Sequence, residues 1–188
     1  MTNCSLEPTP SFDHTDLKVP PITTPTANPN ILKFIVMGDV GTSTPAQYKV
    51  ANAVKSLCDN KGCDFVMLLG DNIYQTGVDS IDDEQFRSKF EEPYQDIDVP
   101  FHMVLGNHDY GSGGIGLEIQ KAWYQVAYTN KSNKWKMPHH YYRYRLNQTD
   151  FFAVDTQAQY LGVDNTQQKK VSAWINDSNA TWKIVYGH

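Results

Sequence analysis

The sequence has no excess of basic residues, few cysteines and no long apolar run. Its 188 residues include 16 Lys and Arg against 21 Asp and Glu, which gives a net charge of −5. A protein that binds nucleic acid by neutralising phosphates needs the opposite balance, so the charge argues against that class. No apolar stretch reaches the roughly 20 residues of a membrane-spanning helix. We therefore expect no nucleic-acid partner and no membrane span.

Two further features are also missing. Residues 1–30 show neither the basic start nor the apolar stretch of a secretory signal. The three cysteines lack the paired spacing of a zinc site. Cys58 and Cys63 flank a predicted turn, where a short disulfide and two inert thiols are both compatible with the sequence. Five Asn-x-Ser/Thr sequons nevertheless indicate a secretory route, although bacterial proteins carry such triplets unused; they begin at Asn3, Asn130, Asn147, Asn176 and Asn179.

The chain divides into two parts by composition. Residues 1–30 hold six of the ten prolines, six threonines and few large apolar residues. Such a segment buries too little surface to offset its ordering entropy, so we expect a flexible arm. Residues 31–188 have the length and apolar content of one folded domain.

Strands and helices alternate along this domain. Apolar runs predict buried strands at 31–36, 65–69 and 101–105, and helices are expected after them at 45–58, 82–90 and 117–128. This order implies right-handed crossovers and an α/β fold with a largely parallel sheet. A hairpin is predicted at 141–154, followed by a helix at 166–176 and a strand at 182–186. The hairpin makes the sheet mixed.

A glycine with a polar partner follows each of four predicted strands. These motifs are Gly38-Asp39-Val40-Gly41, Gly70-Asp71-Asn72-Ile73-Tyr74, Gly106-Asn107-His108-Asp109 and Gly187-His188. In open α/β sheets the carboxyl ends of the strands border the ligand crevice, so the polar groups should meet at one edge. Singly, each is more often a turn, cap or packing residue. Together they are typical of a metal site: oxygen donors suit Fe(III) or Mn(II), and imidazole suits Zn(II) or Fe(II).

At these residues the sequence resembles the calcineurin-like metallophosphoesterase superfamily, and within it the purple acid phosphatases of tartrate-resistant type. The resemblance covers about 31–188, and Tyr74 is its specific element, since related Ser/Thr phosphatases and phosphodiesterases lack a tyrosine ligand. It implies an α/β/β/α sandwich with mixed sheets. The family's last motif, Gly-His-x-His, would follow His188. The resemblance thus implies a chain that is truncated at its C-terminus and a fold that is incomplete at His188.

The resemblance also implies a role for each motif residue. Asp39 and Tyr74 would bind Fe(III), Asp71 would bridge two metals, and Asn107 and His188 would bind a divalent Fe, Zn or Mn. Hydroxide formed on the metals would attack phosphorus. Two more histidine ligands are implied beyond His188, so these 188 residues alone should bind metal weakly and turn over substrate poorly.

Substrate contacts are implied for Asn107 and His108, with His108 as the catalytic residue that steadies the phosphate or protonates the leaving oxygen. The alternative for His108 is a hydrogen bond to a carboxylate beside the metal site. His139-His140 is expected to be a loop pair. Asp155 is expected to be a structural hydrogen-bonding group, and no role is assigned to His14 or His102.

The leading functional hypothesis is a dinuclear-metal acid phosphatase that hydrolyses phosphate monoesters. A phosphodiesterase or nucleotide hydrolase on the same fold is an alternative, because a fold does not fix a substrate. A truncated, non-catalytic remnant is a third possibility from another class. The resemblance implies a secreted, lysosomal or periplasmic protein, and the sequence leaves the oligomeric state open.

Overall fold

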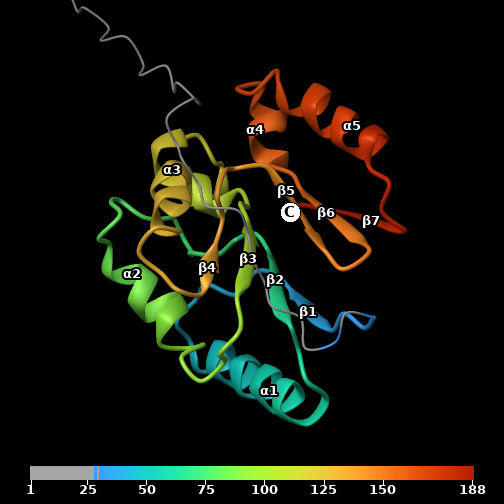
Figure 1. The fold of residues 1–188 in the computed structure, drawn as a ribbon. Coiled ribbons are helices and arrows are strands. Elements are labelled where there is room, and N and C mark those ends of the chain that lie inside the picture. Colours follow the sequence, from blue (N-terminus) through green and yellow to red (C-terminus); the bar gives the residue numbers. More distant parts are fainter. Residues whose placement is uncertain (1–27, 29) are drawn as a thin grey trace, which may run out of the picture.

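The computed structural model describes Asn28 and residues 30–188. The predicted arm, with Asn3, Cys4 and His14, therefore lies outside the described residues except for Asn28 and Asn30. The described chain contains two sheets (Figure 1). The strands of the first are parallel and pair in chain order: β1 (Phe34–Met37), β2 (Phe65–Leu69), β3 (Phe101–Val104) and β4 (Trp135–Lys136).

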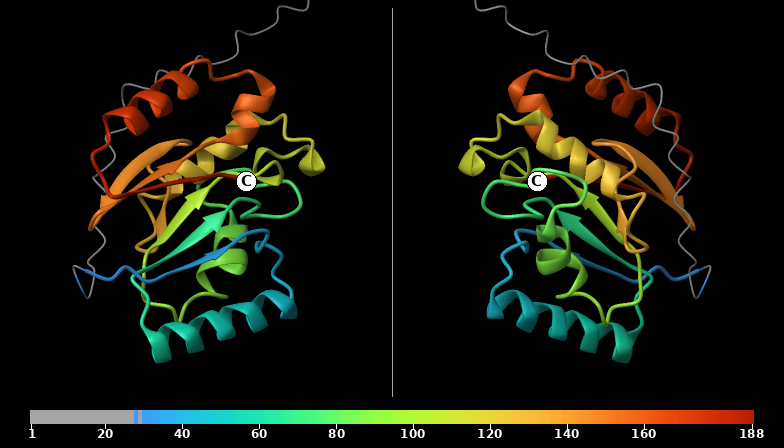
Figure 2. Two further views of the ribbon diagram at one scale, coloured as in Figure 1. Left: turned by 90° about the vertical axis from the view of Figure 1, so that its right-hand side faces the viewer. Right: turned by 90° about the vertical axis from the view of Figure 1, so that its left-hand side faces the viewer.

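The second sheet is mixed. The predicted hairpin forms antiparallel β5 (Tyr142–Leu146) and β6 (Thr149–Ala153), and β7 (Trp182–Tyr186) pairs with β6 in parallel. The strand and helix pattern of the sequence predicted a single mixed sheet. The two sheets instead lie face to face with helices on their outer sides, which makes the α/β/β/α sandwich implied by the family resemblance (Figure 2).

The helices follow the predicted order with shifted ends. α1 (Pro45–Lys61) covers the outer face of the first sheet, and α5 (Gln167–Asp177) covers the second (Figure 2). α2 (Glu84–Phe86) continues as a π-helical turn over Arg87–Glu91, and α3 spans Ile119–Tyr128. Short elements that the sequence did not predict are the 3-10 turns His108–Tyr110 and Ser112–Gly114, and α4 (Thr156–Leu161). None of the helices among the described residues is both long and apolar enough to cross a bilayer.

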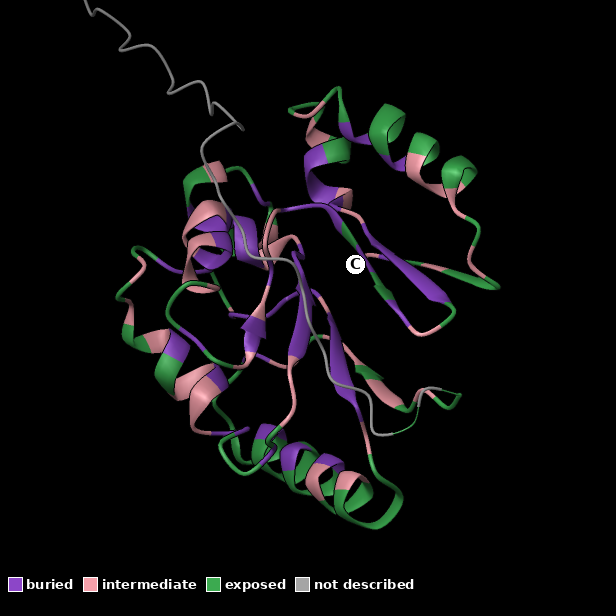
Figure 3. Ribbon diagram, in the orientation of Figure 1, coloured by how far each residue is buried: buried purple, intermediate pink, exposed green. Residues whose placement is uncertain are grey.

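Aromatic side chains join the two sheets. Phe65 of β2 stacks on Phe34 with ring centroids 4.9 Å apart, and meets Phe151 of β6 edge to face at 5.5 Å. His102 of β3 is fully buried and stacks on Tyr144 of β5 at 4.3 Å. β2 and β3 are buried at nearly every position, as expected for strands covered on both faces (Figure 3). These contacts fix the relative position of the two sheets.

The first strand differs from its prediction. Its apolar sequence indicated a buried strand, but β1 lies at the edge of the first sheet, and Val36 is 48% exposed. Apolar composition reports which residues can be buried, and it carries no information about strand order. β7 is likewise an edge strand, of the second sheet, which its sequence did not indicate.

A disulfide joins Cys58 to Cys63, which settles the choice that the sequence left open. The bridge spans the end of α1, where Gly62 N donates to the Cys58 carbonyl at 2.8 Å. Closing such a short loop restricts the unfolded chain, and we expect replacement of both cysteines by serine to lower the free energy of unfolding by about 2 kcal/mol. Urea unfolding measures this loss. Reduction of the wild-type protein should produce the same shift, and an unchanged midpoint would contradict the prediction.

Candidate metal centre

Two carboxylates stand where parallel strands end. Asp39 follows β1 and Asp71 follows β2, and the Asp39 amide donates to the Gly70 carbonyl at 3.1 Å, which ties the two turns together. Both residues have a positive φ, 58° at Asp39 and 51° at Asp71. This left-handed conformation is uncommon for residues with a side chain and clusters at functional sites. The backbone turns at these two positions so that both carboxylates reach the same edge.

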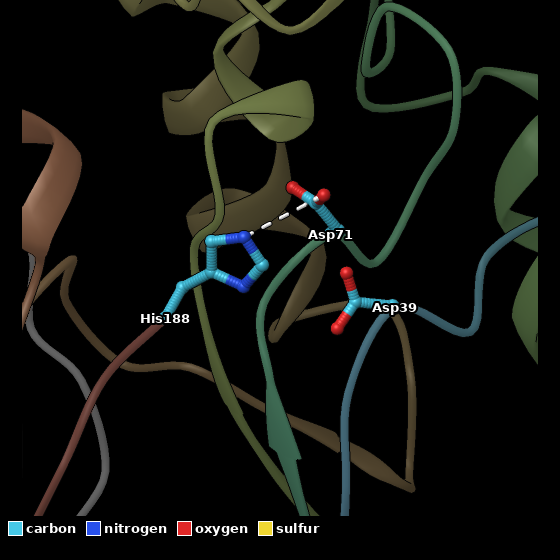
Figure 4. A group of neighbouring side chains, drawn as sticks. All are labelled: Asp39, Asp71 and His188. Atoms are coloured by element: carbon cyan, nitrogen blue, oxygen red, sulfur yellow. Dashed lines mark ion pairs between the residues drawn. The ribbon is translucent and has the colours of Figure 1, made fainter.

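His188 reaches this edge from the second sheet. It follows β7, and one ligand atom from each of Asp39, Asp71 and His188 lies within 4.8 Å of the others. Figure 4 shows their side chains pointing toward one another, with His188 Nε2 3.6 Å from Asp71 Oδ2. The centre therefore lies where the carboxyl ends of strands from both sheets meet, rather than along a single sheet as the sequence suggested.

Tyr74 completes one side of the group. Its hydroxyl lies 2.9 Å from Asp39 Oδ1 and 2.8 Å from Asp71 Oδ2, and a single phenolic proton can be donated to only one carboxylate at a time. Burial and the two carboxylates raise the pKa of the Tyr74 hydroxyl well above its ordinary value. A cation among these oxygens would reverse that effect and favour the phenolate.

Asn107 and His188 face each other on the other side. His188 Nδ1 lies 2.7 Å from the Leu69 carbonyl oxygen, which can only accept, so Nδ1 carries a proton. When the ring is neutral, Nε2 therefore presents a lone pair. Asn107 Nδ2 donates to the Gly114 carbonyl at 2.7 Å, which leaves its Oδ1 directed at His188 Nε2 at 3.1 Å. Two acceptors in contact require a cation or an additional proton between them. The donor set therefore fits a metal ion.

Two glycines permit this close approach. A side chain at Gly106 would place its Cβ 2.2 Å from Asp71 Oδ1. Gly70 has φ +88°, and a Cβ there would lie 2.7 Å from the Cβ of His188. Any larger residue at either position would displace a candidate ligand. The glycines of these motifs are thus required by the packing of the site as well as by the turns.

Asp109 holds together the turns that follow β2 and β3 by accepting hydrogen bonds from both. No role was assigned to it from the sequence. It is fully buried and accepts from the backbone amides of Asn72, Ile73 and Gly106 at 2.9–3.1 Å. The side chains of Asn72 and Gln125 donate to it at 3.0 and 2.9 Å. Burial raises the pKa of Asp109 to about 6, against the opposing effect of these donors. Its position at the end of the Gly-Asn-His-Asp motif was the available signal.

His108 sits beside the candidate ligands. Its amide donates to Asp71 Oδ1 at 2.9 Å, and its ring centroid lies 4.5 Å from that of Tyr74. The alternative in which its ring is held by a carboxylate is not what the structure shows, because Nδ1 lies 2.7 Å from the Gln75 carbonyl oxygen. Nδ1 is thereby the donor, and Nε2 is left as the nitrogen that can act on a ligand.

The remaining predicted polar residues form a separate buried network. Asp155 is fully buried and accepts from the Ala158 amide at 2.9 Å, which agrees with its expected structural role. His140 is also buried, with Nδ1 2.8 Å from Asp155 Oδ2 and Nε2 3.2 Å from Asp164 Oδ2. His139-His140 lies in a bend between β4 and β5, as expected of a loop pair, but the sequence did not indicate that His140 is buried. This network links the bend before β5 to the residues at either end of α4.

Residues 32–188 match the family described as Calcineurin-like phosphoesterase, and the chain belongs to this family. Tartrate-resistant acid phosphatase type 5 of Rattus norvegicus is 33% identical over 194 residues, which cover 87% of this chain and 57% of that protein. The corresponding protein of Sus scrofa is 35% identical over 132 residues, covering 65% of this chain and 36% of its own length. The chain thus spans about half the length of the curated relatives it matches.

Two solved structures share the fold. Purple acid phosphatase PPD1 from yellow lupin (Lupinus luteus) has a TM-score of 0.61 at 16% identity, covering 84% of this chain and 30% of that chain. GAP50, described as the anchor in the inner membrane complex of Plasmodium, has the same TM-score at 24% identity, covering 83% of this chain and 54% of its own. At these identities the likeness shows the metallophosphoesterase fold alone.

Proposed function

We propose that the chain supplies the greater part of the active site of an acid phosphatase that hydrolyses phosphate monoesters with Fe(III) and a divalent Fe, Zn or Mn. The position of Asp71 carries this proposal. Its Oδ2 lies 2.8 Å from the Tyr74 hydroxyl on one side and 3.6 Å from His188 Nε2 on the other. A carboxylate between a phenol and an imidazole is suited to bridge two cations of different character.

The remaining donors divide on either side of Asp71. Asp39 lies with Tyr74, and these hard oxygen donors would hold Fe(III). Asn107 lies with His188, and their amide oxygen and imidazole would hold the divalent ion. Bound metals in such a site polarise a phosphate oxygen and lower the pKa of water enough to provide a nucleophile.

The chain's other groups act on the substrate. His108 Nδ1 is committed to the Gln75 carbonyl, so Nε2 is the nitrogen that would contact the phosphate or protonate the leaving oxygen. Asn107 is fixed through its Nδ2 by Gly114, and its amide would lie beside the bound phosphate. Both groups are placed by backbone contacts, so they need little reorganisation on binding.

A Tyr74→Phe substitution tests the proposed iron site. In a complete protein that also supplies the two further histidine ligands implied by the resemblance, loading with iron and zinc should give a visible phenolate-to-iron absorption band, and the variant should lose it. Much of the turnover of phenyl phosphate at pH 5 should remain, because the phenolate acts on the iron and is not the nucleophile.

Tyr48→Phe, the same change on α1 at a residue outside the candidate ligand set, should leave the band unaltered and serves as the control. A band that persists in Tyr74→Phe would show that Tyr74 is not a ligand. Faster hydrolysis of bis(4-nitrophenyl) phosphate than of phenyl phosphate by the wild-type protein would favour a diesterase instead.

We also propose that the protein follows a secretory route and carries glycans. The Cys58–Cys63 disulfide is of a kind that persists in oxidising compartments. Three sequon asparagines, Asn130, Asn176 and Asn179, are exposed and accessible to a glycosyltransferase. Secretion would agree with both observations.

A further inference from the structure

Two segments that contact the candidate metal centre carry highly exposed apolar side chains. Among the described residues, the most exposed large apolar side chains are Tyr160 at 83%, Ile115 and Trp182 at 67% each, and Leu117 at 60%. Three of these four belong to two neighbouring segments, the loop 111–118 and α4. Single exposed apolar residues are ordinary in proteins, but a cluster at the edge of a site often marks contact with a ligand.

The loop that carries Ile115 and Leu117 is held by internal hydrogen bonds. The Glu118 carboxylate accepts from the Ser112 amide at 2.6 Å and from its hydroxyl at 3.0 Å. The amides of Gly114 and Gly116 both donate to the Gly111 carbonyl at 3.1 Å. These bonds fix the backbone, and the apolar side chains project into solvent from a defined position.

The same loop contacts the candidate catalytic residues. The Gly114 carbonyl accepts from Asn107 Nδ2, and a Cβ at Gly114 would lie 2.6 Å from His108 Nε2. Ile115 therefore follows directly after the residue that packs on the His108 ring. The backbone of the loop at Ile115 thus lies next to His108, and the Ile115 side chain is 67% exposed there.

The first turn of α4 contacts both the loop and the end of the chain at His188, and Tyr160 lies on this short helix. Gln157 Nε2 donates to the carbonyls of Ile115 and Gly116 at 3.2 and 3.1 Å, and the Thr156 hydroxyl donates to the His188 carbonyl at 3.0 Å. Tyr160 is three residues beyond Gln157 and so lies next to it on the helix surface. Figure 2 shows the loop and α4 lying together beside the end of the chain at His188.

We propose that Ile115, Leu117 and Tyr160, here called the apolar rim, bind the leaving group of the substrate. The preferred substrates would then be phosphate monoesters with an aromatic or similarly large apolar leaving group. This inference rests on the proposed function for the position of the phosphate, which places the ester oxygen near His108. The leaving group would extend from there toward the rim. Contact between them would remove the apolar surface of both from water.

Binding of two phosphonates, which cannot be hydrolysed, tests the rim without relying on turnover. Titration calorimetry of the complete, metal-loaded protein would compare phenylphosphonate with 2-naphthylphosphonate, which differ in apolar area and share the same anionic group. We expect the naphthyl compound to bind about tenfold more tightly to the wild-type protein. The triple variant Ile115→Ser, Leu117→Ser, Tyr160→Ser should bind both compounds with similar affinity.

A matched control is Leu57→Ser, which removes an apolar side chain 51% exposed on α1, on the outer face of the first sheet. This variant should keep the wild-type ratio of affinities. The proposal is overturned if the triple variant keeps that ratio while its circular dichroism matches that of the wild type. It is also overturned if the wild-type protein binds neither phosphonate or binds both equally well. Absence of ester hydrolysis together with a rim-dependent preference would instead count against the proposed activity alone.

Discussion

Replacement of Asp71 by Asn is expected to lower metal affinity, and with it phosphate-ester turnover, by about 100-fold or more. Loss of a group that only orients a ligand costs roughly 10–100-fold, and a ligand shared by two metals should cost at least as much. The amide has the shape of the carboxylate and can still accept from the His108 amide, which lies 2.9 Å from Asp71 Oδ1. The variant therefore removes a charge and one acceptor while it keeps the local packing. Metal content after dialysis and turnover of phenyl phosphate measure the loss.

In metal-free protein, the Asp71→Asn substitution should not be harmful to stability. Asp39 and Asp71 place ligand oxygens within 4.8 Å of each other, and two like charges at that distance disfavour the folded state. Without metal, we expect Asp71→Asn to be at least as stable as the wild type. With metal at 100 times the wild-type dissociation constant, the wild type should gain about 2.7 kcal/mol, and a variant that binds 100-fold more weakly only about 0.4 kcal/mol.

Thermal unfolding with and without metal separates these effects. Asp59→Asn is a suitable control, because Asp59 is exposed on α1 and pairs only at the surface with Lys55 at 2.6 Å. It should change neither metal content nor the stabilisation by metal. Wild-type metal content in Asp71→Asn would show that the carboxylate is not a ligand.

The positions of the candidate ligands were predictable because they depend on local rules. A buried apolar run predicts a strand, a glycine marks the turn that ends it, and parallel strands bring their carboxyl ends to one edge. These rules placed Asp39, Asp71 and Asn107 near one another, where the structure has them. The Cys58–Cys63 pairing could not be decided in the same way, since both redox states suit a six-residue span.

Other features depend on contacts between distant parts of the chain. The alternation of β5 suggested a hairpin, but only the packing of Phe151 on Phe65 shows that this hairpin belongs to a second, facing sheet. β4 is two residues long, and α4 six, so neither offers a sequence period to detect. His140 lies in a loop, as predicted, but its burial depends on Asp155 and Asp164, which the fold brings to either side of its ring.

Replacement of Asp109 by Asn is expected to destabilise the fold even in the absence of metal. Oδ2 of Asp109 accepts three hydrogen bonds and Oδ1 accepts two, all at 2.9–3.1 Å. An asparagine keeps only one acceptor oxygen, so its amide nitrogen must face N–H groups. Gln125 can turn its side chain to offer an oxygen, but the Ile73 amide cannot. One or two buried donors left without an acceptor cost about 2–4 kcal/mol in the free energy of unfolding.

Urea unfolding of metal-free protein measures this cost. Asp98→Asn, a change of the same chemistry at an exposed position, should stay within about 0.5 kcal/mol of the wild type. The carboxylate of Asp109 is itself costly to bury, since its pKa is raised to about 6, and this offsets part of the loss. A metal-free Asp109→Asn as stable as the wild type would mean that the three backbone amides find other acceptors. The sign distinguishes the two aspartates: in metal-free protein, loss of charge at Asp71 should not destabilise the fold, whereas loss of charge at Asp109 should.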